Sequence, residues 1–165
     1  MIKVTDVAYA RFQAPDLDKM EAFLTDFGLE RSERTNTALY MRACGSDHHV
    51  HITELGDPKF LGMAFHAASE EDLIKISQSP QASNVEVRKE PGGGKCVRLT
   101  DPDGFLVEVV YNIAQLPEIE ARNAYEFNTG TNAARKGKFV RLEPGPAQCL
   151  RLGHVVIGVK DFNES

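Results

Sequence analysis

The sequence has few cysteines, no excess of basic residues and no long apolar run. Its three cysteines, Cys44, Cys96 and Cys149, are odd in number and lack the CxxC spacing of many metal-binding and redox motifs. This pattern favours free thiols and a reducing, cytoplasmic location. The net charge of −5 argues against the basic face that nucleic acids and anionic membranes require. We therefore expect neither as a partner.

No apolar stretch approaches the roughly 20 residues of a membrane span, and the N-terminal residues lack the apolar core of a signal peptide. The sequence otherwise has an ordinary globular composition, with 42% hydrophobic and 26% charged residues. A chain of 165 residues has room for one full domain and the beginning of another.

The same order of predicted elements occurs twice along the chain. The first copy is a strand, a helix and three strands, over Val4–Phe12, Leu17–Phe27, Leu29–Arg34, Ala38–Ala43 and His49–Glu54. The second copy repeats this order, over Phe60–Ala67, Glu70–Gln78, Val85–Lys89, Lys95–Thr100 and Phe105–Tyr111. Asp16 and Ser69 are the predicted helix caps. Aligning these caps places Tyr9 on Gly62, and the final strands align with His51 on Glu108, as expected of an internal duplication.

We therefore predict an α+β fold in which paired βαβββ units form one curved mixed sheet, with the helices outside it. Residues 1–111 form this module, as units 1–56 and 57–111, and residues 112–149 form a linker. Residues 150–165 are predicted to be the first strand and turn of a truncated second module. An unpaired strand exposes backbone groups that must find a partner, so we expect a homo-oligomer.

Three features together resemble the vicinal oxygen chelate superfamily, which includes glyoxalases, bleomycin-resistance proteins and dioxygenases. They are the tandem βαβββ units, the segment DPDGFLVEVVY (Asp101–Tyr111) and the ending RLGHVVIGVKDF (Arg151–Phe162). The strand pair YMRACGSDHHVHI (Tyr40–Ile52) adds to this similarity. Within the superfamily, the sequence is most similar to the two-module type I extradiol ring-cleavage dioxygenases.

The resemblance implies a metal cup whose ligands come from the first and last strands of each unit. The corresponding positions here are Tyr9, His51, Gly62 and Glu108. A ferrous site of two histidines and one carboxylate needs two imidazoles, and this set has one. The resemblance therefore implies a metal-free, non-catalytic N-terminal module, in which we assign no catalytic or cofactor-binding residue.

His154 is the metal ligand that the resemblance assigns. It precedes Asp161 by the same separation as Tyr9 precedes Asp16, which makes it the first Fe(II) ligand of the second module. A second His, a Glu and a general base are expected beyond Ser165. The intact protein would insert both atoms of O2 beside the diol of a small catechol-type aromatic substrate. We expect the chain alone to be inactive and to bind iron weakly.

Two alternatives remain open from the sequence. The first is another metal-dependent enzyme of the same superfamily, of the glyoxalase or isomerase type. The second is a small-molecule binding module without chemistry, whose cup would be lined by Tyr9, Tyr40 and Phe65.

Two side-chain environments can also be predicted. Glu108 lies in an apolar strand, and a buried carboxylate needs a partner, for which Arg98, Arg42 and His51 are the candidates. Strand alternation predicts that His49 and His51 share one face. Two ligands on one strand do not close a metal site, so we expect these histidines to be structural.

Overall fold

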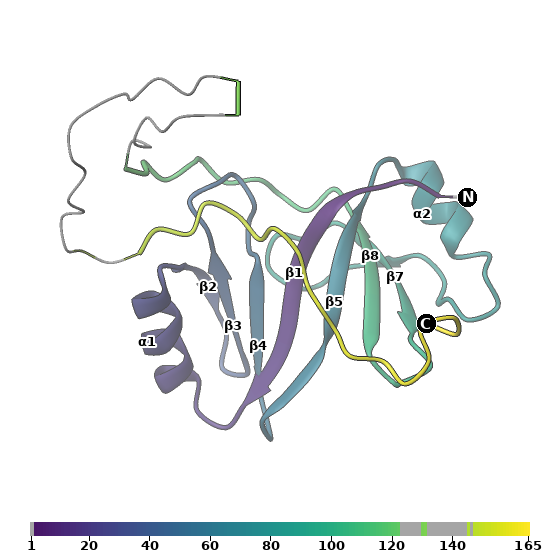
Figure 1. The fold of residues 1–165 in the computed structure, drawn as a ribbon, viewed down its shortest axis with the longest axis horizontal. Helices are drawn as coiled ribbons and strands as arrows, with labels where there is room; N and C mark the ends of the chain where they lie inside the picture. The colour runs from purple at the N-terminus through teal and green to yellow at the C-terminus, as the bar shows by residue number, and fades with distance from the viewer. Residues whose placement is uncertain (1, 123–129, 132–144, 146) are drawn as a thin grey trace.

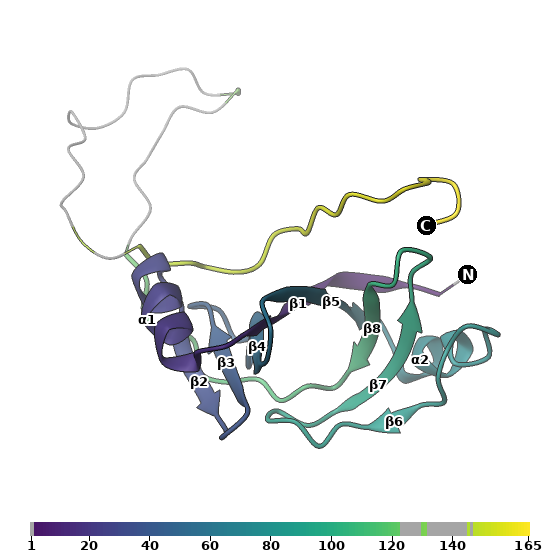
Figure 2. The same cartoon turned by 90° about the horizontal axis from the view of Figure 1, so that it is seen from below.

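The computed structural model describes residues 2–122, 130, 131, 145 and 147–165. The described residues form one curved sheet of eight strands, in the order β2-β3-β4-β1-β5-β8-β7-β6. The helices α1 and α2 lie on the outer side of this sheet, and its inner side encloses a cup (Figures 1 and 2). The predicted α+β fold is confirmed.

The two units have the predicted βαβββ order. The first contains β1 (Val4–Ala14), α1 (Leu17–Phe27), β2 (Glu30–Arg34), β3 (Ala38–Arg42) and β4 (His51–Leu55). The second contains β5 (Lys59–Ala67), α2 (Glu70–Ile76), β6 (Glu86–Val87), β7 (Lys95–Thr100) and β8 (Leu106–Tyr111). Helix α2 and strand β6 are both shorter than predicted. Strand β6 pairs with β7 at only two positions.

Both predicted helix caps are present. The Asp16 carboxylate accepts hydrogen bonds from the backbone N–H groups of Asp18 and Lys19, each at 3.0 Å. The Ser69 hydroxyl accepts from the N–H of Asp72 at 3.1 Å. Asp72 does not complete a reciprocal capping box, because its carboxylate accepts from the Ser69 hydroxyl and from the N–H of Lys3.

Strands β1 and β5 are antiparallel neighbours at the centre of the sheet, and each also pairs in parallel with the last strand of its own unit. Tyr9 lies opposite Ala64, and Arg11 lies opposite Gly62. A local two-fold axis between β1 and β5 therefore relates Tyr9 to Gly62 and Arg11 to Ala64. It agrees with the alignment of Tyr9 on Gly62.

Three apolar clusters hold the layers together. One lies inside the cup, one packs beneath α1, and one packs beneath α2. Their most buried members are Tyr9, Ile52, Ala64, Cys96 and Val110 inside, Leu39 and Met41 beneath α1, and Leu73 and Val97 beneath α2. The alternation of strand side chains therefore divides one core between the two faces of the sheet.

The residues that follow β8 cross from the second unit to the first (Figure 2). Ala114 donates its N–H to the carbonyl of Gly92, Leu116 to that of Ser46, and Ile119 to that of Cys44, at 2.8 to 2.9 Å. Residues 123–129, 132–144 and 146 of the predicted linker lie outside the described residues.

The predicted strand at Leu150–Val159 is not observed. The segment is extended, but it pairs with no strand in the described part of the chain. It crosses the outer face of β1 and β5 (Figures 1 and 2), and ion pairs from Arg151 to Asp6 (3.3 Å) and from Lys160 to Asp103 (3.0 Å) hold it there. Because β1 and β5 are already paired on both sides, they offer this segment no free edge. Neither described helix is long and apolar enough to cross a membrane.

Replacing Gly62 tests the closeness of β5 and β8. A Cβ atom at this position would lie 1.8 Å from the carbonyl oxygen of Leu106. We expect Gly62→Ala to lower the free energy of unfolding by about 2 kcal/mol or more, measured by urea denaturation. Gly158→Ala is the matched control, because a Cβ there would meet no atom within 4 Å. Equal stability of the two variants would contradict the close approach of the strands.

Candidate functional site: the cup of the sheet

The strand register identifies which residues occupy equivalent positions in the two units. Arg11 of β1 lies opposite Ile52 of β4, and Ala64 of β5 lies opposite Glu108 of β8. Since Arg11 and Ala64 are related by the local two-fold axis, Ile52 is the counterpart of Glu108. The alignment of His51 with Glu108 is therefore wrong by one residue, and a shift of one residue changes the face of a strand.

His51 lies on the outer face of the sheet, where its ring stacks on Phe12 with 4.9 Å between the ring centroids. His49 instead faces the cup, and its ring centroid is 5.1 Å from that of Tyr9. The prediction that His49 and His51 share one face is wrong. Val50 packs beneath α1, so both Val50 and His51 lie on the outer side at the start of β4.

The four positions at which the superfamily resemblance places metal ligands are thus Tyr9, Ile52, Gly62 and Glu108. They offer a phenol, an alkyl group, no side chain and one carboxylate. Gly62 cannot be replaced by a ligand without moving β8, because of the nearby carbonyl of Leu106. Only one of the four positions carries a common metal ligand.

Glu108 is the centre of a buried network. Its side chain is 1% exposed. Oε2 accepts hydrogen bonds from the Tyr9 hydroxyl at 2.8 Å and from Arg11 at 3.0 and 3.2 Å, while Oε1 accepts from Nε of Arg98 at 3.1 Å. The predicted partner Arg98 is confirmed. Burial, followed by the charge of Glu108, raises the pKa of Tyr9, so its hydroxyl stays protonated and donates.

The other two predicted partners of Glu108 are wrong. Arg42 instead donates to the backbone carbonyls of Gly45 and Pro117, at 2.8 and 2.7 Å. His51 is separated from the carboxylate by the sheet itself. The sequence analysis also missed Arg11, although its position two residues after Tyr9 in one strand is the pattern that places two side chains on one face.

Arg11 extends the network toward the first unit and toward the loop after β6. Its guanidinium contacts Glu54 at 2.6 Å and Glu90 at 3.0 Å. Arg88, whose side chain is fully buried, also contacts Glu90 at 2.5 Å and lies 5.1 Å from the centre of the Tyr9 ring. Burial alone would raise the pKa of Glu90, but Arg11 and Arg88 lower it overall.

This arrangement does not fit a metal ion. A cation at Glu108 would have to displace the guanidinium groups of Arg11 and Arg98 from the carboxylate. Within the described ranges, no group of three or more His, Cys, Asp or Glu residues could hold a metal. His154 is exposed, and it belongs to the C-terminal segment, which crosses the sheet on the side opposite to the cup (Figure 2). Its role as a ligand stays a prediction.

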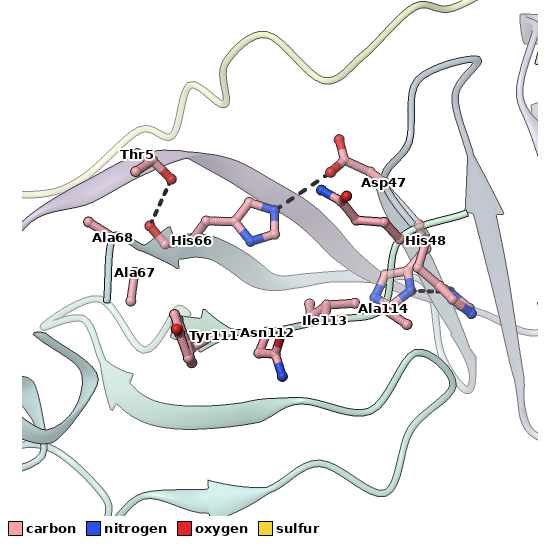
Figure 3. Close-up of a pocket in the computed structure, with 12 residues that line it drawn as sticks. Thr5, Asp47, His48, His66, Ala67, Ala68, Tyr111, Asn112, Ile113 and Ala114 are labelled. Atoms are coloured by element: carbon pink, nitrogen blue, oxygen red, sulfur yellow. Dashed lines mark hydrogen bonds and ion pairs between the residues drawn. The ribbon is translucent and has the colours of Figure 1, made fainter. Parts of the chain in front are cut away.

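A polar cavity of about 660 Å³ lies beside the cup (Figure 3). His66 and Asp47 face each other across it, with 3.9 Å between Nε2 and Oδ1. Nδ1 of His48 lies 3.0 Å from Nδ1 of His49, while Nε2 of His49 is buried without a hydrogen-bond partner in the described structure. Tyr111 also lines this cavity. In the sequence, only the adjacent residues His48 and His49 indicate this cavity, because His66 lies on a different strand, β5.

Two βαβββ units form one curved sheet, and the carboxylate of Glu108 on β8 faces into its cup. This arrangement defines a glyoxalase/dioxygenase-like protein. The sequence model of the Glyoxalase/Bleomycin resistance protein/Dioxygenase superfamily matches residues 6–109, and the chain belongs to this superfamily. The resemblance drawn from the sequence is thereby confirmed.

The chain is similar to three proteins over part of their length. Over 107 residues the chain is 28% identical to a manganese-dependent 2,3-dihydroxybiphenyl 1,2-dioxygenase from Geobacillus genomosp. 3, covering 60% of this chain and 34% of that protein. A Mn(II)-bound glyoxalase from Novosphingobium aromaticivorans matches with a TM-score of 0.65 and 26% identity, over 74% of this chain and 44% of that one. Homoprotocatechuate 2,3-dioxygenase from Brevibacterium fuscum matches with a TM-score of 0.63 and 26% identity, over 72% and 40%. The chain thus spans less than half the length of each.

Removing the charge of Glu108 tests the network. We expect Glu108→Gln to lower the free energy of unfolding by about 3–5 kcal/mol, because Arg11 loses its most buried counter-charge. Glu54→Gln is the matched control, since its side chain is 36% exposed and Arg11 keeps its other partners. Its expected loss is about 1 kcal/mol or less. Urea denaturation measures both, and equal losses would contradict the central role of Glu108.

The buried histidines predict an acid-sensitive fold. Burial lowers the pKa of His49 to about 2 and that of His51 to about 4, below the value of about 6.5 in an unfolded chain. The unfolded chain therefore binds more protons, and stability is complete above pH 6.5 and falls as the pH drops. Each histidine should account for about 1.5 kcal/mol between pH 6.5 and 5.0. The urea midpoint, measured at pH 6.5 and at pH 5.0, checks this: the wild type should lose stability between the two values, and His51→Phe should lose less by the share of His51. An equal loss in both proteins would contradict this assignment.

Proposed function

We propose that this chain is the metal-free, non-catalytic N-terminal module of a metal-dependent extradiol dioxygenase. The observation that carries this proposal is the state of Glu108, whose oxygens are taken up by Tyr9, Arg11 and Arg98. The cup thus keeps the superfamily architecture while its own ion pairs fill the place of a metal. Membership of the superfamily and similarity to two dioxygenases support the reaction class.

Residues 150–165 begin the catalytic module in this proposal, after a linker over 112–149. His154 is its first metal ligand, by the spacing that relates it to Tyr9 and Gly62. The greater length of the matched relatives supports a further module. The ion pairs of Arg151 and Lys160 support the same division, because they hold this segment on the face of the sheet away from the cup.

The proposed metal is Fe(II), with Mn(II) as the alternative because the names of two relatives specify manganese. A metal in that module would chelate a small aromatic diol and bring O2 beside it. The described residues of this chain do not complete such a site, so their role is to build the supporting module. Three free thiols and a net charge of −5 support a cytoplasmic protein that binds neither nucleic acid nor membrane. A homo-oligomer remains part of the proposal, because residues 150–159 are extended and pair with no described strand, which leaves their backbone groups open to a second copy.

The similarity to a Mn(II)-bound glyoxalase favours one second candidate, an isomerase-type enzyme of the same superfamily. A purely ligand-binding module is less well supported, because its cup was expected to be apolar and aromatic. The observed cup contains buried charges on Glu108, Arg11 and Arg88 beside its apolar cluster. Phe65 lies on the face opposite to that of its neighbour Ala64, which lies inside the cup.

The test uses the polypeptide encoded by the continuing reading frame, loaded anaerobically with Fe(II) or with Mn(II). Given catechols and O2, it should form a yellow ring-opened product. His154→Ala should lower both metal content and activity at least about 100-fold. His66→Asn should leave both within about two-fold, and the chain of 165 residues should bind neither metal.

Three outcomes would contradict the proposal. A reading frame that ends at Ser165, or that supplies no further His and Glu, would remove the catalytic module. Tight metal binding by the chain of 165 residues would place the site in the first cup. A metal-bound full-length protein that leaves the aromatic ring intact would favour the isomerase-type alternative.

A further inference from the structure

Two of the three cysteines meet at the end of the β2–β3 hairpin. The N–H of Cys44 donates to the carbonyl of Cys149 at 2.8 Å, and the N–H of Gly45 donates to that of Leu150 at 3.1 Å. The N–H of Cys149 in turn donates to the carbonyl of Gly28 at 3.1 Å. The C-terminal segment is thereby attached to the first unit through Cys149.

The backbone hydrogen bond limits the separation of the two cysteines. With standard bond lengths, an N···O distance of 2.8 Å keeps their Cα atoms within about 6.7 Å of each other. Disulfides in proteins span Cα separations of about 4.4–6.8 Å. The pair therefore meets the Cα spacing that a disulfide requires.

The environments of the two thiols differ. Cys44 is 7% exposed, whereas Cys149 is partly exposed and its sulfur lies 3.5 Å from the carbonyl oxygen of Phe27. Burial raises the pKa of the Cys149 thiol, and the neighbouring Cys44 raises it further. Both cysteines are free in the structure.

We propose that Cys44 and Cys149 form an oxidisable dithiol pair, which becomes an intramolecular disulfide when the protein meets a peroxide. This site is independent of the metal chemistry proposed above. The bond would link the end of the linker covalently to the first βαβββ unit, just before the segment that carries His154.

The reaction balances with hydrogen peroxide as the oxidant. The more accessible Cys149, as thiolate, attacks one peroxide oxygen, and the O–O bond breaks to give a sulfenic acid and hydroxide. The Cys44 thiolate then attacks the Cys149 sulfur, the S–O bond breaks and a second hydroxide leaves. The two hydroxides take up the two thiol protons. Two thiols and one peroxide thus yield one disulfide and two waters.

Cys96 is an internal control. It lies on β7 in the second unit, is completely buried inside the cup, and belongs to a cluster that contains neither of the other cysteines. Because Cys96 is shielded from solvent and its cluster contains no second thiol, peroxide should leave it reduced under conditions that consume the pair.

The test is a thiol count before and after oxidation. The reduced chain of 165 residues is treated with a small excess of hydrogen peroxide, denatured and alkylated. Mass spectrometry should show one alkylated cysteine, Cys96, and one peptide pair linked through Cys44 and Cys149. Dithiothreitol should restore all three thiols. Cys96→Ser should form the same link, while Cys44→Ser and Cys149→Ser should form none.

A second measurement does not depend on peroxide reactivity. Phenylarsine oxide, which binds two neighbouring thiols together, should bind the wild type and Cys96→Ser in a one-to-one ratio and should bind Cys44→Ser at least about ten-fold more weakly. The oxidised protein should also melt about 5 °C or more above its reduced form, because a long loop is closed. Three unlinked thiols after oxidation, links only between chains, or equal arsenical binding by Cys44→Ser would overturn the proposal.

Discussion

The buried carboxylate of Glu108 is the constraint on which the arrangement of the cup depends. A charge that is 1% exposed must be neutralised where it lies, and three side chains from β1 and β7 converge on it. Arg11 is itself buried, and its positive charge is paired with the carboxylates of Glu54 and Glu90 as well. One acid on the last strand thereby fixes side chains in both units, and the curvature of the sheet keeps all of them within reach of it.

The same constraint accounts for the poor fit between this cup and a metal ion. In a cup of this kind, a cation and its ligands can hold the two units together. Here guanidinium groups supply the positive charge, and the close contact of Gly62 with Leu106 removes one position from which a ligand could come. Hydrogen bonds and packing among the described residues thus hold the cup closed around Glu108.

Much of the fold could be predicted because its signals are local. Strand alternation, the caps at Asp16 and Ser69, and the repeated order of elements all depend on neighbouring residues. The face of His51 could not be predicted, since an irregularity at the start of β4 turns both Val50 and His51 outward. The strand expected at Leu150–Val159 depended on a free sheet edge, which only the topology reveals. The cavity of His48, His49 and His66 likewise depends on tertiary placement.

The crossing segment after β8 has a consequence for how the module unfolds. Residues 114, 116 and 119 hydrogen-bond to carbonyls of Gly92, Ser46 and Cys44, so the end of the second unit is attached to the first. Neither unit can then unfold without breaking these hydrogen bonds, although the two units have the same order of elements. We therefore expect the two repeats to unfold together in one thermal transition.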